Sequence, residues 1–222
     1  MTTNLPSRRV LLAALTWGAV WGLYEATVGY LVHAFARMPG TSAVLLVPFA
    51  VFCLMGARTA GGLRASVLAA VVAASIKLVN LLLPNPTLLA VLNPAMAIVM
   101  EGLVFAGVVR WLRPDARRPS PALLAAGVLV FSLGWRVVFL AWSAVLAAGW
   151  SLGTLTGSLG EPLLGFVLRD GLLSALVIMA VVALTHRGGR LALAERVTPG
   201  AGGVAVLVAL AVAAEVAVAM LG

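Results

Sequence analysis

The chain has 222 residues, of which 63% are hydrophobic and 10% are charged, and its mean hydropathy is +1.12. Soluble domains carry about 25% charged residues, so this composition excludes an ordinary soluble protein and indicates an integral membrane protein. The net charge of +8 does not indicate a nucleic-acid partner, because the basic residues are scattered between long apolar stretches and form no soluble nucleic-acid module.

Seven stretches are apolar over the length of about 20 residues that a membrane-spanning helix needs. In chain order they are Val10–Phe35, Ser42–Ala60, Leu63–Leu83, Leu88–Leu112, Pro121–Trp150, Pro162–Thr185 and Gly203–Leu221. The segments between them are too short to fold separately. We therefore predict one all-α transmembrane domain over residues 1–222, a bundle of six to seven helices with its core at 8–186 and an additional helix at 203–221.

Arginines gather at one end of the predicted spans. Arg8 and Arg9 precede the first span and further arginines follow the second, fourth and sixth, whereas the opposite loops contain only Arg37. The positive-inside rule therefore predicts a cytoplasmic amino terminus, in a plasma (inner) membrane of the bacterial type. Contact with membrane lipids is a second expected role of these arginines. The glycine-rich connection Ser151–Gly160 then lies outside, as either a lid over a cavity or a flexible linker.

The first span carries a stripe of small residues. Ala14, Gly18, Gly22 and Ala26 recur every four residues, which lets another helix approach closely. The stripe either packs inside the bundle or docks a separate subunit.

Beside this stripe the first span carries Trp21 and Glu25, with Tyr24 next to them. A carboxylate flanked by aromatic rings can hold a cationic or heteroaromatic ligand, so we predict these three residues as ligand contacts. In the alternative interpretation the tryptophan only fills the bundle.

The connection between the third and fourth spans predicts a second group of ligand contacts. Asn93 followed by Pro94 is a typical helix start, so residues 84–92 are expected to be extended or re-entrant. Glu101 follows on the face of Asn93, and Lys77 and Asn80 of the third span can meet that face. An ion pair between Lys77 and Glu101 is one arrangement that this placement allows.

Four ionisable residues lie deep in the spans: Glu25, Lys77, Glu101 and Arg136. A charge near the bilayer centre costs at least about 2.5 kcal/mol, so each should be paired or should touch a polar ligand. We predict a ligand site. Two acids and two bases also balance, so a structural ion-pair network is the alternative.

Other chemistry has little support in the sequence. With two histidines and one cysteine, neither a metal site nor a cofactor is expected, and we predict no enzymatic activity. Arg169 and Asp170 are neighbours that point about 100° apart on a helix, so each is expected to pair with another helix. Glu215 lies in the seventh span without an evident partner.

The small-residue stripe, the cytoplasmic amino end and the outer polar site near residues 77–101 resemble the substrate-binding S component of energy-coupling factor transporters. The resemblance is architectural and covers about residues 8–186, so the seventh span is additional. It implies capture of a vitamin-like or other micronutrient from the outer side. It also implies a transmembrane coupling subunit and ATPase subunits as partners, because this chain has no nucleotide-binding motif.

The expected function is thus that of a solute-binding membrane subunit with a small-molecule substrate. A self-sufficient secondary transporter or channel that uses intramembrane carboxylates, and a scaffold subunit of a membrane complex, are the alternatives.

Overall fold

The computed structural model of the chain describes residues 6–35, 41–83, 88–112, 120–150, 160–188 and 200–221. These ranges are helical apart from short turns, and no β-strand occurs in them. Seven helices among them are long and apolar enough to cross a membrane, so the predicted all-α, multi-pass bundle is confirmed. Residues 151–159, which make up most of the predicted lid or linker, lie outside the described ranges.

The elements follow the predicted spans to within a few residues. In chain order they are α1 (Arg8–Tyr24), the π-helical segment η1 (Glu25–Gly29), α2 (Tyr30–Phe35), α3 (Thr41–Gly61), α4 (Leu63–Leu78), the 3₁₀ segment η2 (Val79–Leu82), α5 (Leu88–Trp111), α6 (Pro121–Trp150), the π-helical segment η3 (Pro162–Arg169), α7 (Asp170–Gly188) and α9 (Ala201–Leu221). The Ser7 side chain accepts a hydrogen bond from the Val10 N–H at 3.4 Å and so caps α1. Gly62 adopts a φ of 81°, which permits the tight turn from α3 into α4.

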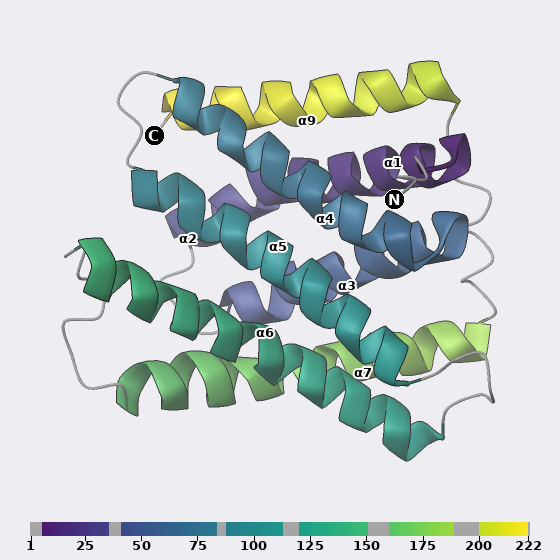
Figure 1. Cartoon of the computed structure of the whole chain (residues 1–222), viewed down its shortest axis with the longest axis vertical. Coiled ribbons are helices and arrows are strands. Elements are labelled where there is room, and N and C mark those ends of the chain that lie inside the picture. The colour runs from purple at the N-terminus through teal and green to yellow at the C-terminus, as the bar shows by residue number, and fades with distance from the viewer. Residues whose placement is uncertain are drawn as a thin grey trace, which may run out of the picture.

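The helices form two layers (Figure 1). One layer contains α9, α1, α3 and α7 side by side, and α4, α5 and α6 cross them in the other. Successive spans run in opposite directions, so the helix ends that carry Arg8, Arg58, Arg64 and Arg110 share one side of the bundle, the right-hand side in Figure 1. We refer to this side as the arginine-rich end.

Small residues bring α1 and α4 into close contact. A Cβ atom on Gly18 would lie 2.6 Å from Val72 Cβ, and one on Gly22 would lie 2.8 Å from Ile76 Cδ1. The stripe therefore packs inside the bundle, and its predicted use as a docking surface for a separate subunit is wrong, because α4 already covers it. All four residues of the stripe are buried: Ala14, Gly18, Gly22 and Ala26.

The start of α5 differs from the prediction. The Asn93-Pro94 pair predicts a helix start, but α5 begins at Leu88 and contains Pro94. A proline inside a helix removes one backbone hydrogen bond and crowds the carbonyl four residues before it, but the residues before Pro94 include good helix formers, and the helix extends through them. An extended or re-entrant conformation is therefore wrong for residues 88–92, while residues 84–87 lie outside the described ranges.

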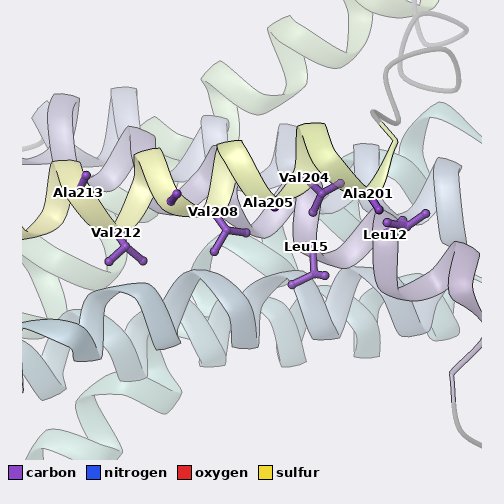
Figure 2. A pocket seen from close by; sticks show the side chains of 9 residues that line it. Leu12, Leu15, Ala201, Val204, Ala205, Val208, Val212 and Ala213 are labelled. Carbon is purple, nitrogen blue, oxygen red and sulfur yellow. The ribbon is translucent and has the colours of Figure 1, made fainter.

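The seventh span, α9, lies at the edge of the bundle against α1 and the far end of α4 (Figure 1). A groove of about 690 Å³ runs between α1 and α9, and Figure 2 shows that leucine, valine and alanine side chains line it. No polar side chain belongs to this lining, so the groove offers nothing that would orient a polar solute.

Candidate functional site

A polar cavity of about 500 Å³ lies between the two helix layers, and each of the seven spans contributes to its wall. The volume is in the range of small-molecule sites, which is about 300–1,000 Å³. The cavity lies toward the helix ends opposite the arginine-rich end, because its lining includes residues of η1 and the start of α2, the start of α3, the end of α4 and the first half of α5. Five of the predicted ligand contacts line it: Glu25, Lys77, Asn93, Glu101 and Arg136.

Arg136 is the most deeply buried charge in this wall, with 1% of its surface exposed. Its Nη1 donates to the main-chain oxygen of Ser132 at 2.6 Å, and its Nη2 donates to Ser174 Oγ at 2.7 Å. The guanidinium carbon also lies 4.6 Å from the centre of the Trp135 ring, at cation–π distance. These contacts hold the side chain in place between α6 and α7, but every partner is neutral.

The charge of Arg136 therefore has no carboxylate in direct contact among the described residues, although Glu101 and Asp170 act on it electrostatically. No carboxylate within the described ranges forms an ion pair with it, and its Nε atom and the Nε1 atom of Trp135 are both buried without a hydrogen-bond partner. Buried polar groups are nearly always hydrogen-bonded, and a buried charge without a counterion is costlier still. These two donors are therefore unsatisfied in the described part of the chain.

Glu101 is the second charge of this wall that has no ion pair among the described residues. It is 6% exposed, and in the described part of the chain its carboxylate makes neither a hydrogen bond nor an ion pair. It interacts electrostatically with Glu25 and Arg136. Asn93, two turns earlier on α5, has a buried Oδ1 atom that also lacks a donor among the described residues. This wall thus offers free acceptors.

Of the two aromatic residues expected to flank Glu25, only Trp21 contacts its carboxylate through a hydrogen bond. Trp21 Nε1 donates to Glu25 Oε1 at 3.4 Å, and Trp21 itself is fully buried behind the carboxylate. The Tyr24 ring instead stacks on Phe49 with 3.7 Å between ring centres, and its hydroxyl donates to the Leu45 main-chain oxygen at 3.3 Å. Neither aromatic residue lines the cavity.

Lys77 lines the cavity, and its ion-pair partner comes from the seventh span. Its Nζ atom lies 2.6 Å from Oε1 of Glu215, and Asn80 Nδ2 donates to the same oxygen at 2.6 Å. Lys77 therefore pairs with Glu215 and not with Glu101. Since α9 packs against the far end of α4, it brings Glu215 to Lys77 from 138 residues away, which no local pattern reveals.

Asp170 lines the cavity although no pattern in the sequence singled it out as a ligand contact. Its Oδ1 atom lies 2.8 Å from Nε of the neighbouring Arg169, so the expectation that each pairs with another helix is wrong. The long arginine side chain folds back along the helix to reach it. The two residues stand at the junction where η3 ends and α7 begins.

Three departures from regular α-helix border the cavity. The π-helical segment η1 contains Glu25, the 3₁₀ segment η2 follows Lys77, and the π-helical segment η3 contains Phe166, which also lines the wall. π-Helical turns are rare and occur often at functional sites, because they redirect side chains that a regular helix would place elsewhere. Their clustering here distinguishes this cavity from the apolar groove beside α9.

Some of the charged residues that line the cavity form ion pairs and others do not. Arg169 neutralises Asp170 and Glu215 neutralises Lys77. Of the charged residues that line the cavity, Glu25, Glu101 and Arg136 therefore have no ion pair in the described part of the chain. When ionised, these two acids and one base sum to a charge of −1. Opposite charges at separate points of one cavity suit a solute with a cationic group and a separate acceptor.

Aromatic rings close one side of the cavity. Trp135, Phe139 and Phe166 line it next to Arg136, with 5.6 Å between the ring centres of Trp135 and Phe166 in an edge-to-face arrangement. Such rings supply flat apolar surface for a ligand ring or chain.

Metal chemistry finds no support in the residues that the structure describes, where no group of three or more histidine, cysteine or acidic side chains is placed to hold an ion. No protein-family model, curated protein or solved structure matches the chain.

Proposed function

We propose that this protein is a membrane-embedded solute-binding subunit and that its ligand occupies the polar cavity. The observation that supports this best is the buried guanidinium of Arg136, which belongs to the wall of a cavity of about 500 Å³ and forms no ion pair in the described part of the chain. A charge in a membrane interior normally pairs with another charge or serves a transported or bound solute. The solute supplies the missing counterpart.

The proposed ligand is a small molecule with a cationic group and a hydrogen-bond acceptor. The acceptor meets the free donors of Arg136 and Trp135, and the cationic group meets the carboxylates of Glu25 and Glu101. Its apolar part lies against Phe139 and Phe166. The ligand enters from the side opposite the arginine-rich end, which the positive-inside rule places outside the cell.

A finer proposal is the role of an S component in an energy-coupling factor transporter, in a plasma membrane of the bacterial type. The chain would then capture a vitamin-like or other micronutrient without enzymatic activity, and a coupling subunit with ATPase subunits would drive uptake. Support comes from the helix bundle and from the position of the cavity near the end of α4 and in the first half of α5. The coupling subunit would need a surface other than the first-span stripe, since α4 covers that stripe.

One observation favours a second candidate, a proton-linked secondary transporter. Glu25 and Glu101 interact electrostatically in one cavity, and neither forms an ion pair within the described ranges. Two neighbouring carboxylates in a membrane interior are typical of proton relays. This carrier would transport without partners, whereas a binding subunit would only bind.

The proposed function is tested by native mass spectrometry of the purified protein, followed by identification of any small molecule released on denaturation. We expect a bound solute in the wild type and its loss in Glu101→Gln and Arg136→Lys. Glu161→Gln is the control, because Glu161 is exposed and does not line the cavity. Equal retention of the solute by the cavity variants would overturn the proposal.

The two candidates are then separated in liposomes that contain only this chain. Uptake of the identified solute that follows a proton gradient would establish the secondary transporter. Binding without uptake, converted to ATP-dependent uptake by added partner subunits, would establish the S-component role.

A further inference from the structure

A second groove lies at the arginine-rich end, far along the helices from the polar cavity. It has a volume of about 840 Å³ and runs between the start of α4 and the end of α5, which lie side by side in Figure 1. Its lining consists of Pro6, Leu63, Arg64, Val67, Leu68, Ala106 and Arg110.

Two arginines form the rim of this groove. Arg64 is the second residue of α4 and Arg110 is the second-last residue of α5, and both are exposed. In the described part of the chain neither guanidinium makes a hydrogen bond or an ion pair. Arg9 at the same end differs, because its Nε donates to the Ala60 main-chain oxygen at 2.6 Å. The rim therefore presents two free guanidinium groups to one groove.

The apolar part of the groove lies on the membrane side of this rim. Leu68 stands four residues after Arg64, and Ala106 stands four residues before Arg110. At about 1.5 Å per residue, each is about 6 Å deeper in the bilayer than its arginine. The groove thus changes from charged to apolar along the direction in which a lipid changes from headgroup to chain.

Exposed apolar residues extend this surface toward the membrane centre. Val71 of α4 is 45% exposed and Leu103 of α5 is 56% exposed, one turn beyond the groove lining on each helix. Gly107 lies between Leu103 and the rim, and a Cβ atom there would meet no atom within 4 Å. A hydrocarbon chain therefore finds open space and apolar walls below the arginines.

We propose that this groove is a binding site for an anionic phospholipid. Its phosphate group lies between Arg64 and Arg110, and one acyl chain follows Val67, Val71 and Leu103 into the membrane. Arginine suits this role because its planar guanidinium binds phosphate oxygens in pairs. The bare phosphate ion would leave the apolar part of the groove unused, and a zwitterionic lipid would bring a positive headgroup to a positive rim. This proposal does not depend on the solute site.

The test uses the full chain after delipidation, titrated in native mass spectrometry with phosphatidylglycerol, phosphatidylcholine or inorganic phosphate. We expect tighter retention of phosphatidylglycerol than of phosphatidylcholine. In Arg64→Gln/Arg110→Gln the affinity for phosphatidylglycerol should fall by about 30-fold, from about fivefold for each basic residue. Arg8→Gln/Arg58→Gln is the matched control, because it removes the same charge from the same end without touching the lining.

Ala106→Trp fills the apolar part of the groove without changing its charge. It should also weaken retention of phosphatidylglycerol, which separates lipid binding from attraction to the rim alone. Competition by millimolar inorganic phosphate would overturn the proposal in favour of a free-anion site. Equal losses in the two double variants would reduce it to general surface attraction, and equal retention of both lipids would exclude headgroup recognition.

Discussion

The ion pair between Lys77 and Glu215 is expected to hold α9 on the bundle, and the burial of its two members predicts unequal effects of removing them. Glu215 is 1% exposed and Lys77 is 21% exposed. Lys77→Met leaves a buried carboxylate with only Asn80 as donor, so it should destabilise the protein by about 3–5 kcal/mol. Glu215→Gln leaves an ammonium group that is partly exposed at the cavity wall, so its effect should be smaller, about 1–3 kcal/mol.

Thermal unfolding in detergent, followed by tryptophan fluorescence, measures both effects. Each kcal/mol changes Tm by about 2–4 °C in a protein of this size, so Lys77→Met should lower Tm by at least about 6 °C. The double variant Lys77→Met/Glu215→Gln should be more stable than the sum of the two single effects predicts, by about 1–3 kcal/mol. Glu161→Gln is the control and should change stability by less than about 0.5 kcal/mol.

Strictly additive single effects would refute this interpretation of the pair. If the effects of substituting Lys77 were non-additive with those of substituting Glu101 and not Glu215, Lys77 would pair with Glu101. That result would show that α9 does not cover the end of the cavity at Lys77.

Three further predictions follow from the packing, the orientation and the free charges. Gly18→Leu should destabilise the bundle by at least about 1–3 kcal/mol, because α4 leaves no room at Gly18, whereas Gly107→Leu faces open space and should leave Tm unchanged. In a cysteine-free background, a cysteine at Gly157 should react with an impermeant reagent from outside and one at Ala116 should not; reversed labelling would invert the orientation. Glu101→Gln should leave the Tm of ligand-free protein nearly unchanged but abolish its rise with the identified solute; a normal rise would remove Glu101 from the site.

The spans could be predicted from the sequence because the requirement for apolar side chains in a bilayer acts on each helix separately. The seven predicted stretches accordingly match the seven membrane-length helices. A charged residue within an apolar stretch can also be recognised without knowing how the helices pack. The sequence singled out Glu25, Lys77, Glu101 and Arg136 in this way, and the structure brings all four to one cavity. The Asn93-Pro94 pair did not predict the start of α5 correctly. The residues before it include good helix formers, and the helix begins at Leu88.

Only the tertiary structure decided which groups meet. Whether the first-span stripe is internal depended on α4 lying against Gly18, and the partner of Lys77 depended on α9 reaching the far end of α4. A helix pattern specifies which face a residue occupies, but not which of six other helices covers that face, because in a membrane many apolar faces are equivalent. The polar cavity is the outcome of that choice: the packing gives Lys77 and Asp170 partners and leaves Arg136 and Glu101 without one in the described ranges.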